Sequence, residues 1–189
     1  APLVRSTATQ TFSRYLDFVR RDDAERRKMV NALTTNHTFF YRERHHFDHL
    51  AQTVRPALLA KAKAGQPVRI WSAGCSTGEE LYSLVMTLLG PDKAAARPFL
   101  KGDVVVLATD LADHAVAGAL AASYAPESLK DVPRELTQCW VREENGEARI
   151  TPEACAMVRI KRLNLLGAWP MKRPFDVIFC RNVMIYFDQ

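Results

Sequence analysis

The amino-acid sequence predicts an α/β fold built on a parallel β-sheet. Val68–Ala73 and Val104–Thr109 are short apolar runs rich in β-branched residues, as buried parallel strands are. A helical pattern follows each run, and Phe175–Cys180 is the clearest strand of all, closed by a polar Arg-Asn pair. This alternation of strands and helices is typical of α/β layers with right-handed crossovers.

The N-terminal part is expected to be helical. Apolar residues recur there at helical spacing in two groups, which are Phe12, Tyr15, Leu16 and Val19, and then Met29, Val30 and Leu33. Arg20–Lys28 lies between the groups and is almost wholly charged, as in an exposed turn or the polar start of the second helix. A longer helix is expected from about Arg44 to Ala64, and Pro56 is where a kink would fall.

The stretch from Tyr124 to Ala156 breaks the strand–helix rhythm with three prolines and an Asn145-Gly146 turn. We interpret it as an inserted β-hairpin subdomain, followed by a further strand at Val158–Arg162. The expected organisation is therefore an N-terminal helical segment and linker over residues 1–50 and an α/β domain over 51–189, with the insertion at about 124–156.

The composition is that of an ordinary globular protein, with 48% hydrophobic and 25% charged residues. No apolar run approaches the roughly 20 residues that cross a bilayer, and Ala1–Gln10 lacks the pattern of a secretory signal, so we expect a cytoplasmic location without membrane insertion. The four cysteines form no CxxC pair and the five histidines have no ligand cluster beside them, so neither a disulfide framework nor a metal site is expected. The net charge of +5 favours acidic partners, and nucleic acid and an acidic protein surface both remain open.

Two motifs follow the first two strands. The loop WSAGCSTGEE, Trp71–Glu80, has glycines that allow a sharp turn and a close approach to a ligand beyond the end of a strand. It is neither GxGxxG nor a phosphate-binding loop, which disfavours a nucleoside triphosphate, and a plain tight turn would also account for two glycines. Asp110, at the end of the second strand, has the position of a ribose-binding carboxylate, although a helix N-cap is the simpler alternative.

Two further motifs carry polar groups among apolar ones. In CRNVMIYFD, Cys180–Asp188, Asn182 would present an amide and Tyr186 a phenol, or else the apolar residues are simply core. In TTNHTFFYRERHHF, Thr34–Phe47, polar residues alternate with aromatics, a pattern that could also stack the bases of single-stranded nucleic acid.

Together and in this order, these motifs resemble those of chemotaxis receptor methyltransferases of the CheR type. The matching segments are TTNHTFFYRERHHF, WSAGCSTGEE, ATD, NLL and FDVIFCRNVMIYF, and the resemblance runs from Phe12 to the end. It implies a Rossmann-like S-adenosylmethionine-dependent methyltransferase sheet, an N-terminal helical segment and a small inserted antiparallel β subdomain. Members of the family continue with C-terminal strands that are missing from these 189 residues.

The resemblance also implies an activity and a set of site residues. The expected enzyme is a protein-glutamate O-methyltransferase that converts S-adenosylmethionine to S-adenosylhomocysteine while it forms glutamate methyl esters on chemotaxis receptors for sensory adaptation. The motifs place the cofactor contacts at Asn36, Thr38, Arg42, Glu79, Asp110, Asn164, Leu165, Asn182 and Val183, with Glu80 as the alternative to Glu79. No metal is implied.

The chemistry needs no general base, because a glutamate side chain with a pKa near ~4.3 is already an anionic nucleophile. Catalysis then consists of holding the carboxylate oxygen, the methyl carbon and the sulfur in line. Arg42 and Tyr186 are the residues we expect to position these groups.

The expected partner is the cytoplasmic helical domain of a receptor. Glu143–Ala148 is short beside family members whose β subdomain grips a C-terminal receptor peptide, so tethering by such a peptide is doubtful and recognition by the basic N-terminal segment is expected instead. The alternative function is a signalling or scaffold protein that binds S-adenosylmethionine or S-adenosylhomocysteine without catalysis, and a nucleic-acid-binding module ranks below it.

Overall fold

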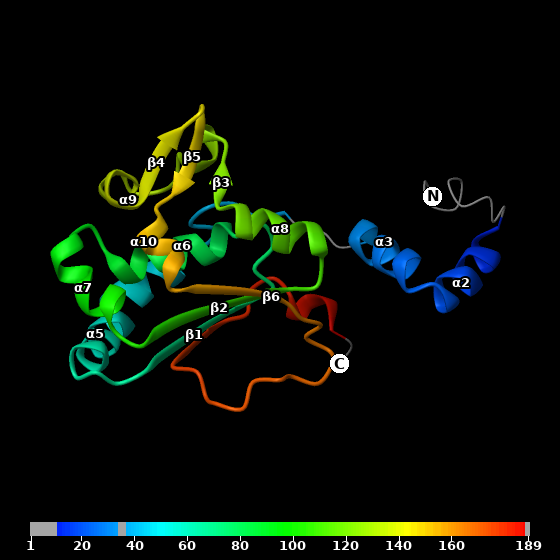
Figure 1. The fold of residues 1–189 in the computed structure, drawn as a ribbon, viewed down its shortest axis with the longest axis horizontal. Helices are drawn as coiled ribbons and strands as arrows, with labels where there is room; N and C mark the ends of the chain where they lie inside the picture. Colours follow the sequence, from blue (N-terminus) through cyan, green and yellow to red (C-terminus); the bar gives the residue numbers. More distant parts are fainter. Residues whose placement is uncertain (1–10, 34–36, 188–189) are drawn as a thin grey trace.

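The computed structural model describes residues 11–33 and 37–187, except the side chain of Tyr186. Its centre is a four-stranded parallel sheet in the order β6-β2-β1-β7 (Figure 1). The strands are β1 (Val68–Ala73), β2 (Val104–Asp110), β6 (Val158–Arg162) and β7 (Val177–Phe179). All four strands therefore lie where the sequence predicted them, and the α/β fold class is confirmed.

Helices follow the strands as expected for crossover connections. Helix α6 (Glu79–Leu89) follows β1, and α7 (Lys93–Lys101) returns the chain to β2. Helix α8 (Asp113–Ala121) follows β2 and lies along one face of the sheet with α6 (Figure 1). Residues 163–176 run across the other face, where Trp71 of β1 contacts the rings of Trp169 and Phe175 at 4.9 and 5.3 Å between centroids.

The long helix before the first strand is interrupted, as the proline in it suggested. It comprises α4 (His45–His49), a π-helical segment (Leu50–Val54) and α5 (Arg55–Lys63). Proline has no backbone N–H and cannot donate to the preceding turn, so the hydrogen-bond spacing changes at this place.

The inserted segment forms an antiparallel sheet in the order β3-β5-β4. Its strands are β3 (Ser123–Tyr124), β4 (Val141–Glu144) and β5 (Glu147–Ile150), accompanied by a 3₁₀ turn (Pro126–Leu129) and the helices α9 (Arg134–Trp140) and α10 (Pro152–Ala156). Asn145 and Gly146 both have positive φ, 55° and 78°, as a two-residue type I′ turn requires. The predicted hairpin is therefore present.

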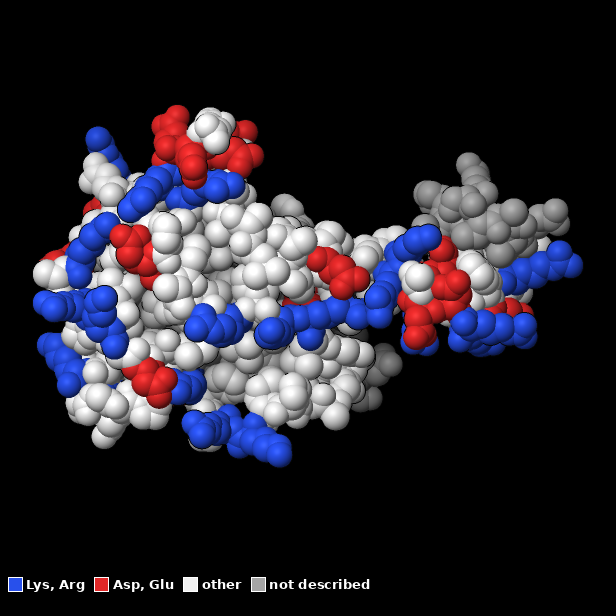
Figure 2. All heavy atoms as spheres, viewed as in Figure 1, with Lys and Arg blue, Asp and Glu red and all other residues white. Residues whose placement is uncertain are grey.

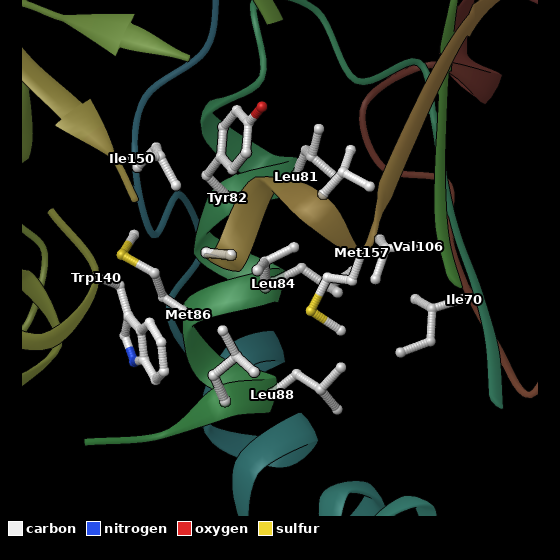
Figure 3. Close-up of a cluster of buried hydrophobic side chains, with 14 of the residues drawn as sticks. Ile70, Leu81, Tyr82, Leu84, Met86, Leu88, Val106, Trp140, Ile150 and Met157 are labelled. Carbon is white, nitrogen blue, oxygen red and sulfur yellow. The ribbon is translucent and has the colours of Figure 1, made fainter. Parts of the chain in front are cut away.

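Helix α6 joins the two sheets into one core. Every residue from Leu81 to Leu89 is buried, and Figure 3 shows this helix between Ile70 and Val106 of the parallel sheet and Trp140 and Ile150 of the insertion. The Trp140 indole is fully buried and donates to the carbonyl oxygen of Gly90 at 2.6 Å, just after α6 ends. The insertion is consequently anchored to the helix that begins beside the first motif loop.

The N-terminal helices α2 (Phe12–Arg21) and α3 (Asp23–Leu33) pack against each other as a helical hairpin at one end of the molecule (Figure 1). Tyr15 and Glu25 are buried between them, and the tyrosine hydroxyl donates to the carboxylate at 3.2 Å. The hairpin meets the α/β part where the backbone N–H of Asp113 donates to the Asn31 side chain at 3.1 Å. Among the described helices, none is long and apolar enough to span a membrane.

Asp176 links the segment just before β7 to α5 and to β1. Its contribution to the stability of the fold can be tested by substitution. Its carboxylate accepts from Lys61 Nζ at 2.5 Å and from the Arg69 backbone N–H at 2.8 Å. Burial alone would raise the pKa of Asp176, but these hydrogen bonds outweigh it and hold the pKa below its ordinary value. The stabilisation is thus present above the pKa of the unfolded chain and is lost as pH falls through the lower, folded-state pKa.

We therefore expect Asp176→Asn to lower the free energy of unfolding at pH 7 by about 1–3 kcal/mol, and to cost less near pH 3, below the ordinary aspartate value of ~3.9, where part of the stabilisation is already lost. Urea denaturation at both pH values measures the difference, with Asp131→Asn as a control at an exposed aspartate. An equal loss at both pH values would contradict the assigned ion pair.

Candidate functional site

A cavity of about 550 Å³ opens beyond the carboxyl ends of the parallel strands. This is the place where open α/β sheets bind ligands, and the volume lies in the range of small-molecule pockets. Its lining comes from α3, from α4 and the segment before it, from the end of β2 and the start of α6, and from the loops that follow β1, β2, β6 and β7. Seven of the predicted site residues line it, namely Thr38, Arg42, Asp110, Asn164, Leu165, Asn182 and Val183.

Asp110 ends β2 and is only 8% exposed. Its two carboxylate oxygens accept backbone N–H groups, from Ser76 at 2.8 Å and from Ala112 at 2.9 Å. A carboxylate has about four acceptor positions, so two remain for hydroxyl groups of a ligand. The helix-cap alternative is not sufficient, because Asp110 lines the cavity and the residue before α8 is Ala112.

The loop after β1 turns sharply beside the cavity. Gly74 has φ 80°, and a Cβ at this position would overlap the Val183 side chain. Ser76 has φ 48° and directs its N–H to Asp110. The first glycine of the motif is therefore required by a close approach between the loops that follow β1 and β7.

The two acidic residues that open α6 differ in their surroundings. Glu80 lines the cavity, where it accepts from Ser72 Oγ at 2.7 Å and lies 3.4 Å from Arg181 Nη1. Glu79 is absent from the described lining and accepts from Thr77 Oγ1 at 2.7 Å. Successive helical residues point in different directions, so only one of the pair can face the cavity. Burial raises the pKa of Glu80, although Ser72 and Arg181 act to lower it.

The segment before α4 brings further predicted residues to the cavity. Arg42 donates from Nη1 to the His37 carbonyl oxygen at 3.0 Å, and its guanidinium lies 5.9 Å from the centre of the Phe39 ring. Thr38 also lines the cavity. Asn36, the remaining predicted contact of this motif, lies outside the described residues.

The loops after β6 and β7 complete the lining. Asn164 accepts from the Leu166 backbone N–H at 3.0 Å, which shapes the turn that carries Leu165. Asn182 has φ 56° and donates from Nδ2 to Glu43 at 3.2 Å. The backbone of Tyr186 belongs to a 3₁₀ turn (Met184–Tyr186), but its side chain is not among the described groups.

Arg181 is a member of the site that sequence reasoning did not single out. It lies two residues after the end of β7, and its side chain is only 10% exposed although it carries a charge. It lines the cavity and contacts both Glu80 and Glu43. The available signal was its position beside Asn182 at the end of a buried strand, where charged residues face the ligand edge of the sheet.

The comparisons with known proteins agree on one family. The family model "CheR methyltransferase, SAM binding domain" matches residues 36–189. A "probable chemotaxis protein methyltransferase" of Rhizobium etli is 39% identical over 194 residues, which cover 98% of this chain and 70% of that protein. "Chemotaxis protein methyltransferase 2" of Pseudomonas aeruginosa is 38% identical over 95% of this chain and 62% of its own length.

A third relative, the chemotaxis protein methyltransferase of Escherichia coli, is 38% identical over 98% of this chain. The chain spans 63% of the length of that protein. The family model covers well over half of the chain and includes most of the residues that line the cavity at the ligand edge of the sheet. The chain belongs to the CheR methyltransferase family, whose matched domain binds S-adenosylmethionine.

Proposed function

We propose that the protein transfers the methyl group of S-adenosylmethionine to glutamate side chains of chemotaxis receptors in the cytoplasm, giving methyl esters. The observation that carries the proposal is the cavity at the carboxyl ends of the four parallel strands, where Asp110 at the end of β2 and Glu80 at the start of α6 present carboxylates. The names of the relatives add chemotaxis as the setting.

The lining fits the cofactor chemically. Asp110 keeps two acceptor positions that suit the two hydroxyls of a ribose. The Glu80 carboxylate, only 13% exposed, can accept from the ammonium group of the amino-acid end, and we assign it this contact in place of Glu79. The leucines after β6 and Val183 form apolar walls suited to the adenine. The bound sulfonium cofactor supplies an activated methyl group with its own leaving group.

The protein's own contribution is orientation rather than proton transfer. The acceptor glutamate is ionised at neutral pH and needs no base. Arg42 lines the cavity, and its guanidinium can hold an incoming carboxylate by a charge-assisted hydrogen bond. We propose this positioning role for Arg42, and an orienting hydroxyl for Tyr186 on the strength of its motif alone.

Incubating the chain with methyl-labelled cofactor and a cytoplasmic receptor fragment tests the proposal. Alkali-labile label on the fragment is the expected result, since carboxyl methyl esters hydrolyse in base. We expect Arg42→Ala to lower kcat by about 100-fold through loss of orientation. Arg44→Ala is the matched control, because Arg44 is exposed, lies near Asp48 and is outside the described cavity lining.

Saturable binding of S-adenosylhomocysteine without any transfer to a receptor would contradict the enzyme and leave the non-catalytic binding protein as the explanation. Full turnover by Arg42→Ala would remove Arg42 from the reaction. Full turnover by Tyr186→Phe would do the same for the tyrosine hydroxyl.

The charge distribution supports an acidic helical partner. The helical hairpin α2–α3 carries six Lys and Arg residues against four Asp and Glu, and Figure 2 shows its basic side chains exposed. The same view shows acidic side chains gathered at its top, over β4 and β5 at the tip of the insertion. We propose that the receptor's helical domain docks on the hairpin side and not on the acidic tip of the insertion.

A further inference from the structure

Arg181 joins three separate segments of the site. Its Nη1 lies 3.4 Å from a carboxylate oxygen of Glu80 at the start of α6. Its Nη2 donates to Glu43 at 3.2 Å and also to the carbonyl oxygen of Arg42. The guanidinium carbon lies 5.3 Å from the centre of the Phe47 ring, which covers one face of the group.

The turn that Arg181 contacts is conformationally strained. Tyr41 and Glu43 have φ values of 56° and 55°, in the left-handed region that side chains other than glycine disfavour. Asn182, next to Arg181, has φ 56° and donates to the same Glu43 carboxylate. Such conformations persist only where surrounding contacts determine them, and they gather at functional sites. Tyr41 is held by Ser83 and Thr87 of α6, whereas Arg42 and Glu43 are held by Arg181 and Asn182.

Folding alone does not account for this buried arginine. Its Nε is buried and has no hydrogen-bond partner among the described residues. A buried donor without a partner costs stability, and a buried ion pair is weak evidence for a stabilising role. Arg181 is nevertheless held against groups that line the cavity, so its contacts are better explained by the demands of the site.

We propose that Arg181 is a positioning residue for the methyl transfer, a clamp that fixes the Glu80 carboxylate and the 41–43 turn so that Glu80 and Arg42 face the cofactor together. The inference rests on the proposed function. It predicts that cofactor binding depends on Arg181 in two ways. One is the positive charge beside Glu80. The other is the planar set of guanidinium N–H donors, called the fork below, which holds the 41–43 turn.

The effect of the Arg181 charge can be measured as the pH midpoint of cofactor binding, which a merely structural role would not change. An opposite charge nearby favours the ionised form of a carboxyl group by about 1–3 pH units. Loss of the Arg181 charge should therefore move the pH midpoint of cofactor binding, set by Glu80, upward. The charged groups that act on Glu80 are Arg181, Arg42 and Glu43. The thiols of Cys75 and Cys180 have pKa values raised by burial, so they stay neutral between pH 5 and 8, the range of the titration described next.

The test is calorimetric titration with S-adenosylhomocysteine between pH 5 and 8. We expect Arg181→Met to weaken binding about 30-fold at pH 7 and to raise the pH midpoint by about one unit. Arg181→Lys keeps the charge but not the fork, so its midpoint should stay near that of the unmodified chain while its affinity falls about 10-fold. Arg69→Met is the matched control, because Arg69 grips Asp103 with two 2.7 Å hydrogen bonds at the opposite end of β1.

Unchanged affinity and midpoint in a folded Arg181→Met protein would overturn the inference. If that variant does not fold, unchanged affinity in Arg181→Lys would overturn it instead. If Arg69→Met lost affinity as strongly as Arg181→Met, the loss would be explained by general destabilisation of the protein. That result would also overturn the inference. Failure of the proposed function is a separate result, in which the unmodified chain binds S-adenosylhomocysteine but methylates no receptor.

Discussion

Replacing Asp110 with alanine is expected to abolish measurable S-adenosylhomocysteine binding, with a loss of affinity of about 100-fold or more. We assign the Asp110 carboxylate, at the end of β2, as the acceptor for both ribose hydroxyls. Each charge-assisted hydrogen bond contributes about 1.5–3 kcal/mol, and two such bonds correspond to a factor of this size. Calorimetry with S-adenosylhomocysteine measures the change.

Asp110 also supports the loop, since it accepts from the backbone of Ser76 and Ala112. The variant should therefore have a lower melting temperature as well, and circular dichroism must establish that it is folded at the temperature of the titration. Asp113→Asn is the control, because Asp113 begins α8 nearby and pairs with Arg162 on the surface. A folded Asp110→Ala protein with unchanged affinity would refute the ribose contact.

The second large effect is expected from a pair of neighbouring substitutions. Glu80→Gln should weaken S-adenosylhomocysteine binding by about 10- to 100-fold, because the amide loses a charge-assisted bond to the cofactor's ammonium group. Glu79→Gln should change affinity by less than about threefold, since its carboxylate bonds to Thr77 and lies outside the described lining. The two variants differ by one position and share the same chemistry, so each is the other's control. The reverse order of effects would return the contact to Glu79.

Glu80 also makes the affinity for S-adenosylhomocysteine depend on pH, and its pKa shift fixes the direction of that dependence. Burial raises the pKa of Glu80 above its ordinary value, so Glu80 takes up a proton at a higher pH than an exposed glutamate. Protonation removes the charge that attracts the ammonium group, and affinity should therefore fall as pH decreases through that pKa. In Glu80→Gln this part of the pH dependence should vanish. A profile unchanged by the substitution would assign the titration to another group.

The sequence alone determined the order and type of the main elements. Val68–Ala73 and Val158–Arg162 have the same bounds in the structure as in the prediction, because each has β-branched residues at its first and third positions and lies between clear breaks. The Asn145-Gly146 turn was also predictable from the sequence, since few other residue pairs tolerate two positive φ values. The family and its cofactor followed from motif order, whereas the position of Asp110 at a strand end left both a ligand carboxylate and a helix N-cap open.

Tertiary structure decided what depends on direction and on contacts between distant segments. Sequence could not choose between Glu79 and Glu80, because the choice depends on how α6 is rotated against the sheet, and packing along Leu81–Leu89 sets that rotation. Arg181 was not singled out because its partners, Glu80 and Glu43, are 101 and 138 residues away along the chain. A side chain's role as a clamp exists only once its partners have been brought together, whereas a strand is already encoded in its own neighbouring residues.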